Sequence, residues 1–154
     1  MKDLVLYREQ LIPADIETAW SFFSSPENLE KITPPDMGFD VLTDVKNIKM
    51  FEGQIIDYVV RPMLGIPMKW RTEIRQVNEP FSFTDVQLKG PYSKWEHTHH
   101  FEQTENGTLM KDVIRYRVPF GPIGQLFNTL AIRRRLVHIF DFRQKIIYSV
   151  FDRI

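Results

Sequence analysis

The hydrophobic pattern of the last part of the chain predicts one long helix. From Gly121-Pro122 to about Phe151, apolar residues recur every three or four positions, which is the spacing of one helix face. Proline is favourable at the first helical position because its missing amide would be unpaired there. The apolar stripe changes phase between Asn128 and Ile132, so we expect a kink or a break into two helices. Roughly 30 residues at ~1.5 Å each span ~45 Å, which requires a broad surface beneath the helix.

The chain before this helix follows mainly the two-residue period of strands. In residues 68–77, Trp70, Thr72 and Ile74 alternate with charged neighbours, so one face is predicted to be buried and the other solvated. Further strands are predicted at 4–11, 39–42, 54–60, 81–88, 94–103 and 108–118. Their close spacing and the Asn106-Gly107 turn favour hairpins and therefore an antiparallel sheet.

Two short helices are predicted after the first strand. One begins at Ala14-Asp15-Ile16, and the second begins at Ser25-Pro26-Glu27, with a serine cap and a proline at the first position. The expected architecture is therefore α+β: a curved antiparallel sheet of about six to seven strands around a long C-terminal helix. The length of 154 residues fits a single domain, 1–154.

Composition excludes several classes of function. Acidic and basic residues balance at 20 each, so no overall field favours nucleic acid as a partner. There is no cysteine, which excludes disulfides and thiolate chemistry. No signal-like segment and no membrane-spanning run is present, so we expect a cytoplasmic protein. Twelve Phe, five Tyr and three Trp fit either a bulky core or an aromatic cavity wall.

The strand at 94–103 carries the main candidate chemistry. Alternation places Trp95, His97, His99 and Phe101 on one face. Because these residues include the large aromatics, the face should be turned toward the helix. Two histidines are then expected to point into an enclosed space.

Neighbouring strands add more polar groups to the same inner surface. Asp112 and Tyr116 share a face of 108–118, and Asp85 and Gln87 share a face of 81–88. Apolar walls with a few converging polar groups are typical of a small-molecule pocket. The predicted ligand-binding residues are Tyr58, Trp70, Phe83, Asp85, Gln87, Trp95, His97, His99, Phe101, Asp112 and Tyr116, with Phe127 and Leu130 from the helix.

Three interpretations of this polar set remain open. The groups can satisfy one another in an ordinary core without any ligand. The His-x-His spacing of His97 and His99, with Asp112 or Asp85, resembles a metal ligand set. Alternatively, His97 or His99 oriented by Asp112 could move protons on a bound carbonyl compound, which makes these three the catalytic candidates. We expect no metal and no other cofactor, since no cysteine and no third histidine in register completes a metal site.

Two further segments bear on partners. The apolar loop Met63-Leu64-Gly65-Ile66-Pro67 is either a lip of the pocket or a loop tucked onto the sheet. The run Arg133-Arg134-Arg135 is expected to be the solvated side of the helix, with one arginine able to turn inward to a carboxylate. Together these segments would also fit an interaction module that docks another protein.

A set of short motifs follows in order along nearly the whole chain: Ile12-Pro13-Ala14, Trp20, Leu29, Thr33-Pro34-Pro35, Gly53, Tyr58, Gly65-Ile66-Pro67, Trp70, Ile74, Phe83-Thr84-Asp85, Gln87, Gly90-Pro91-Tyr92, Trp95 to Phe101, Asp112, Tyr116 and Pro119-Phe120-Gly121. In these motifs the chain resembles the START/Bet v 1-like superfamily of helix-grip proteins, and within it the bacterial ligand-binding SRPBCC subgroup. The resemblance implies a cavity between sheet and helix that takes a small hydrophobic or aromatic ligand, with carriers, sensors and polyketide cyclases among its relatives.

Overall fold

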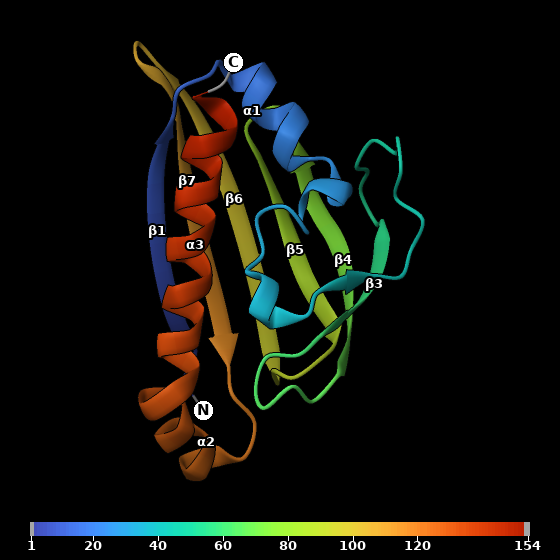
Figure 1. The fold of residues 1–154 in the computed structure, drawn as a ribbon, viewed down its shortest axis with the longest axis vertical. Helices are drawn as coiled ribbons and strands as arrows, with labels where there is room; N and C mark the ends of the chain where they lie inside the picture. Colours follow the sequence, from blue (N-terminus) through green and yellow to red (C-terminus); the bar gives the residue numbers. More distant parts are fainter. Residues whose placement is uncertain (1, 153–154) are drawn as a thin grey trace.

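The computed structural model describes residues 2–152, and its centre is one seven-stranded antiparallel sheet (Figure 1). The strands lie in the order β1-β7-β6-β5-β4-β3-β2. The first strand therefore pairs with the last, and the others follow as successive neighbours. This arrangement confirms the α+β helix-grip prediction. The bounds are β1 (Leu4–Ile12), β2 (Asp40–Val41), β3 (Ile55–Val60), β4 (Met68–Asn78), β5 (Ser82–Lys89), β6 (Lys94–Thr104) and β7 (Gly107–Arg117).

The C-terminal helix is continuous but changes its winding where the apolar stripe changes phase. It comprises α2 (Gly121–Phe127), a π-helical turn (Asn128–Ile132) and α3 (Arg133–Phe151). The π turn absorbs the phase shift, because its wider winding adds residues without breaking the helix. Asn128 is buried here, and its Oδ1 accepts a 2.9 Å hydrogen bond from the Tyr116 hydroxyl.

The segment after β1 contains the two predicted short helices, of which the second is shorter than expected. The first is α1 (Ile16–Phe23), capped by the Asp15 carboxylate, which accepts a 2.8 Å bond from the Thr18 amide. The second begins where predicted, after Ser25 with Pro26 at its first position, but it is a 3₁₀ helix of three residues, Pro26–Asn28, and does not extend to Ile32. Another 3₁₀ helix follows at Pro35–Met37. Ser25 makes no capping bond, and Asn28 instead donates its side-chain amide back to the Phe22 carbonyl at 2.8 Å.

A β-bulge bends β4 and with it the sheet. The pairing of β4 with β5 shifts register between Arg75 and Asn78, and Gln76 adopts a left-handed conformation with φ of 55°. The Glu52 carboxylate accepts hydrogen bonds from the Gln76 and Val77 amides at 2.9 and 2.8 Å. These bonds satisfy the backbone groups that leave the ladder. Bulges increase local bend and twist, so the sheet can curve around a helix.

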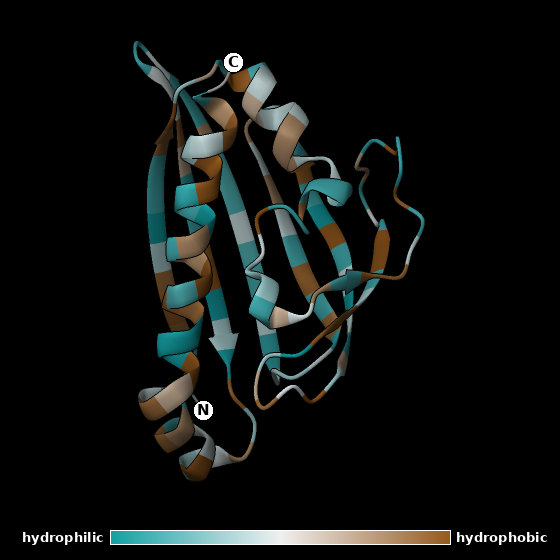
Figure 2. Ribbon diagram, in the orientation of Figure 1, coloured by the Kyte–Doolittle hydropathy of each residue, from teal (hydrophilic) through white to brown (hydrophobic). Residues whose placement is uncertain are grey.

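Two ion pairs connect α3 to other parts of the fold. Arg8 on β1 donates to Asp141 at 2.5 Å, and Arg135 donates to Asp36 in the second 3₁₀ turn at 2.7 Å. The helix is thus fastened to β1 on one side and to the α1–β2 connection on the other. Figure 2 shows the alternating polar and apolar positions along the strands beneath it. Within residues 2–152, no helix is both long enough and apolar enough to cross a membrane.

Candidate ligand cavity and its histidine–aspartate cluster

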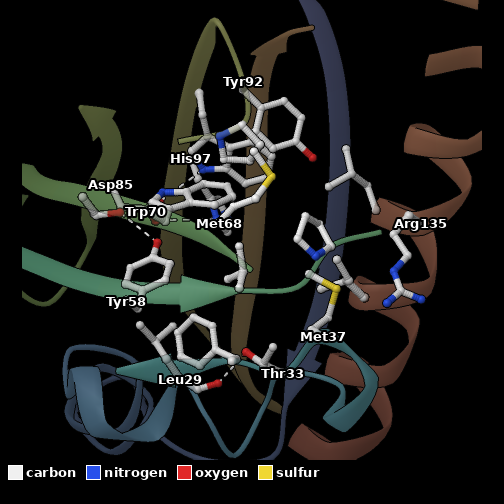
Figure 3. A pocket seen from close by; sticks show the side chains of 18 of the residues that line it. Leu29, Thr33, Met37, Tyr58, Met68, Trp70, Asp85, Tyr92, His97 and Arg135 are labelled. Carbon is white, nitrogen blue, oxygen red and sulfur yellow. Dashed lines mark hydrogen bonds and ion pairs between the residues drawn. The ribbon is translucent and has the colours of Figure 1, made fainter. Parts of the chain in front are cut away.

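A cavity of about 740 Å³ lies between the sheet and the C-terminal helix. This volume falls in the range of about 300–1,000 Å³ that is typical of small-molecule sites. Strands β3 to β6 contribute one wall, α3 the opposite one, and the α1–β2 connection closes a side (Figure 3). Lining residues that are also strongly exposed, including Ile66, Phe120 and Ile123, mark the opening.

The sheet side of the cavity is an aromatic wall. Tyr58 stacks on Trp70 with ring centroids 5.8 Å apart, and Trp70 meets Trp95 edge to face at 5.3 Å. The Tyr58 hydroxyl is paired with the Thr72 hydroxyl at 2.8 Å. Burial, with the nearby Asp85 charge, raises the pKa of Tyr58 far above its ordinary value. The phenol therefore stays neutral and offers the cavity a flat apolar face.

Deep in the wall, two histidines and two aspartates form a compact cluster. His97 Nε2 lies 2.7 Å from Asp112 Oδ1, and His99 Nε2 lies 2.8 Å from Asp85 Oδ2. The remaining ring nitrogens make longer contacts: His97 Nδ1 is 3.6 Å from Asp85 and His99 Nδ1 is 3.1 Å from Asp112. Each imidazole thus lies between both carboxylates.

Strand register brings these four residues together. On β6, His97 and His99 are two positions apart on the inward face. Asp85 on β5 is directly opposite His97, and Asp112 on β7 is directly opposite His99. The shortest bonds run diagonally, from each histidine to the other's opposite partner. The two imidazole rings lie with their centroids 3.8 Å apart and their planes tilted by 30°, and Phe83 stacks on His99 at 4.3 Å.

The environment separates the proton affinities of the two histidines. Burial, reinforced by the neighbouring His99 charge, holds the pKa of His97 below its ordinary value. Burial also opposes charge on His99, but hydrogen bonds to Asp112 and Asp85 outweigh it and raise the His99 pKa. For Asp85 and Asp112, burial would raise the pKa, yet the two imidazoles prevail and lower both values. The cluster therefore favours the charged form of both aspartates, and it favours a proton on His99 over a proton on His97.

The same cluster contains a possible metal-ligand group. One donor atom each from Asp85, His97 and His99 lies within 4.8 Å of the others. Asp112 would then orient both rings through their other nitrogens, as carboxylates do behind metal-bound histidines. The donors are already joined by hydrogen bonds, however, so a metal would have to displace the 2.8 Å bond between His99 and Asp85. The expectation that the protein holds no metal stays a prediction.

Eight of the thirteen residues predicted to bind ligand line the cavity. They are Tyr58, Trp70, Phe83, Asp85, Trp95, His97, His99 and Phe127. Within the apolar loop at the opening, Met63, Ile66 and Pro67 also line it, whereas Leu64 is 92% exposed. The loop therefore takes the position of a lip.

The other five predicted residues lie outside the cavity lining. Gln87 is turned toward the β5–β6 loop, where its amide bonds the backbone of Tyr92 at 2.7 and 3.2 Å. Phe101 packs edge to face against Trp20. Asp112 sits behind the histidines, Tyr116 is bonded to Asn128, and Leu130 faces solvent at 64% exposure.

Sequence reasoning missed Arg143, a charged residue of α3 that lines the cavity. Its side chain is buried at 9% exposure, and its guanidinium lies over the Phe140 ring at 4.9 Å from the centroid. The sequence did indicate that Arg143 faces inward, because it occurs with Leu136, Phe140 and Ile147 at the three- and four-residue spacing of the buried helix face. An arginine within an apolar stripe is the anomaly that could have identified it.

A curved sheet that grips a helix over a cavity defines the helix-grip class, and solved structures support this assignment. The chain is similar to a START superfamily protein from Mycobacterium smegmatis, with 15% identity, coverage of 95% and 98% of the two chains, and a TM-score of 0.69. The protein TTHA0849 from Thermus thermophilus gives 17% identity, 96% and 99% coverage, and a TM-score of 0.65. Ara h 8.0201 gives 10% identity, 96% and 99% coverage, and a TM-score of 0.63. At these identities the likeness concerns the fold alone.

The family follows from the sequence itself. Residues 12–139 match the model of the family described as polyketide cyclase / dehydrase and lipid transport. The chain belongs to this family, as the START/Bet v 1-like resemblance predicted. A comparison with curated proteins found no match.

Proposed function

We propose that this protein binds and carries a small, mostly apolar molecule in the cavity between the sheet and α3. The observation that carries the proposal is the cavity itself, whose 740 Å³ are bounded largely by aromatic and aliphatic side chains. Burial of apolar ligand surface there contributes about 25 cal/mol per Å² before ordering costs. The histidine–aspartate cluster gives one part of the wall a polar character that can orient the ligand.

The family description supports this proposal, because it includes lipid transport alongside cyclase and dehydrase activity. The similar solved structures support the fold of the chain and not its function. The cytoplasmic location and the lack of a nucleic acid partner remain predictions from the sequence.

Native mass spectrometry of the freshly purified protein tests the proposal first. We expect a discrete additional mass that organic extraction releases, or saturable binding of the neutral dye N-phenylnaphthylamine to the emptied protein. The comparison variant replaces Ile139, a cavity-lining residue of α3, by tryptophan, which fills part of the cavity and should weaken binding of the dye. A bare protein mass combined with no dye binding by the wild type would overturn the proposal.

A second candidate function is proton-transfer catalysis of the cyclase or dehydratase kind. The observation that favours it is the position of His97 and His99 in the cavity wall, with carboxylates on both sides. A neutral His97 could take a proton from carbon beside a ligand carbonyl. The resulting carbanion would form a carbon–carbon bond at a second carbonyl, whose oxygen takes the proton back. The step is then an isomerisation, and loss of water would complete a dehydration.

Comparison of extracted molecules separates the two functions. The protein and its H97Q/H99Q variant would be expressed in the same host, and the molecules released from each identified. Catalysis predicts an unreacted precursor on the variant and its cyclised or dehydrated product on the wild type. The same molecule on both would leave carriage as the function and remove catalysis.

A further inference from the structure

The cavity contains a positive charge that has no partner among the described residues. Arg143 is 9% exposed, and its Nε and Nη1 atoms are buried without a hydrogen-bond partner within residues 2–152. Its one specific contact there is the Phe140 ring, 4.9 Å from the guanidinium carbon. An arginine cannot release its proton to escape burial. A buried, unpaired charge is costly, so such a group normally has an acceptor when the protein functions.

The neighbouring Arg135 shows what a satisfied arginine looks like on the same helix. It also lines the cavity, but its Nη1 donates to the Asp36 carboxylate at 2.7 Å and its Nη2 to the Asp36 carbonyl at 3.3 Å. Figure 3 shows Arg135 and Met37 together on the side of the cavity opposite Tyr58 and Asp85. Arg143, two helical turns further along, has no corresponding carboxylate among the described residues. The charge of Arg143 is therefore available to a ligand.

The histidine–aspartate cluster does not neutralise Arg143 by contact. Asp85 accepts from His99 at 2.8 Å and from the Trp95 indole at 3.4 Å, while Asp112 accepts from His97. Phe140 contacts both sides, since its ring is 5.6 Å from the His97 ring and lies under the Arg143 guanidinium. The aspartates are thus committed to the histidines, and the arginine is left to the cavity.

With one exception, the buried polar atoms of the cavity wall that lack a hydrogen-bond partner in the described chain are N–H donors. The exception is His99 Nδ1, which faces Asp112 at 3.1 Å. Apart from that nitrogen, the unpartnered buried atoms of lining residues in the described chain are Trp70 Nε1, Arg135 Nε, and Nε and Nη1 of Arg143. All of them are N–H donors. A ligand that satisfies this wall must bring acceptors.

We propose that Arg143 is an anion-binding site within the cavity, and that the natural ligand is a mostly apolar molecule bearing an oxyanion, such as a carboxylate. A guanidinium offers two parallel N–H groups that match the two oxygens of a carboxylate. The aromatic wall takes the apolar body of the ligand, and the arginine fixes its acidic end. This inference rests on the proposed function and narrows the substrate class to apolar acids.

Two fluorescent probes that differ only in their end group test the inference: pyrenebutanoate and pyrenebutanol. We expect the wild type to bind the acid at least about tenfold more tightly than the alcohol. Replacement R143M, which keeps an unbranched apolar side chain and removes its charge, should abolish this preference for the acid over the alcohol. The matched control is R134M, an exposed arginine of the same helix, which should behave like the wild type.

The outcomes separate the inference from the function on which it rests. Equal affinities for acid and alcohol in the wild type, unchanged by R143M, would overturn the anion site and leave ligand binding intact. If the wild type binds neither pyrene probe but binds N-phenylnaphthylamine, the anion site falls and ligand binding stands; if it binds none of the three and its native mass is bare, both proposals fall. R143K retains a positive charge and should keep part of the preference for the acid, so a variant that folds poorly as R143M can still be judged.

Discussion

His97 Nε2 lies 2.7 Å from Asp112 Oδ1, and both side chains are buried. The bond joins strand β6 to its neighbour β7 beside the cavity. Removal of one partner from a buried ionic network costs about 3–5 kcal/mol, because the remaining groups lose their compensation. The cluster therefore contributes to the fold as well as to the site.

Replacement of Asp112 by asparagine should destabilise the protein by about 3–5 kcal/mol at neutral pH. Urea unfolding measures the change. The Asp112→Asn replacement should also weaken the acid dependence of stability. Because the pKa of Asp112 is lowered in the folded protein, this carboxylate contributes stability above its ordinary pKa of 3.8, and the contribution is lost as pH falls through the folded-state value. Asp141→Asn, at an exposed ion pair with Arg8, is the control and should change little. Equal losses in both variants would contradict the role of burial.

The two cluster histidines should titrate on opposite sides of the ordinary imidazole pKa of 6.5, with His97 below and His99 above it. NMR titration of the assigned ring signals gives both values. The signs follow from linkage: stability from His99 is complete below pH 6.5 and lost as pH rises through its folded-state pKa. The His97 contribution is present above 6.5 and lost as pH falls through its folded-state pKa. A reversed order of the two titrations would refute the assignment of charge.

A bulky side chain at position 139 should block the cavity without unfolding the protein. Ile139 lies on α3, is partly buried and lines the cavity. Ile139→Trp is expected to lower the affinity for a neutral apolar probe at least about tenfold, since it occupies space that the ligand needs. Tyr148→Trp, on an exposed position of the same helix, is the matched control. Fluorescence titration measures both, and unchanged affinity in Ile139→Trp would place the probe elsewhere.

A buried hydrogen bond joins the start of the π-helical turn to strand β7. Tyr116→Phe removes the hydroxyl that donates to Asn128 Oδ1 at 2.9 Å and leaves a buried amide oxygen unpaired. We expect a loss of about 1–3 kcal/mol in the free energy of unfolding, measured by chemical denaturation. Tyr148→Phe removes an exposed hydroxyl and serves as the control. If both variants were equally stable, Asn128 would have another partner.

Alternation and helical spacing were sufficient to predict most of the fold. The inward face of β6, the burial of Trp70, Thr72 and Ile74, and the interruption at Asn128–Ile132 all follow from periodicity. The helix after Ser25 begins where predicted but is shorter than expected, because start signals do not set how far a helix extends. The side-chain amide of Asn28 bonds back to the Phe22 carbonyl at the point where this 3₁₀ helix ends.

The candidate site was only partly predictable. Periodicity shows which side chains face inward but not how neighbouring strands align, so the pairing of His97 with Asp112 and of His99 with Asp85 required the register. Gln87 faces the loop because the Tyr92 backbone offers it two bonds, a contact that no pattern encodes. Arg143 was visible as an anomaly in the stripe, yet its lack of a partner among the described residues emerges only in three dimensions.

The π turn sets how the two parts of the C-terminal helix are oriented about the helix axis. If the same residues wound as an ordinary α-helix, the one residue in excess would rotate the part of the helix after them by about 100° relative to the part before. The chain could then keep Asn128 bonded to Tyr116 or keep Phe140 and Arg143 facing the cavity, but not both. The wider winding is thus what allows an anchored helix start and a correctly aimed binding face to coexist in one helix.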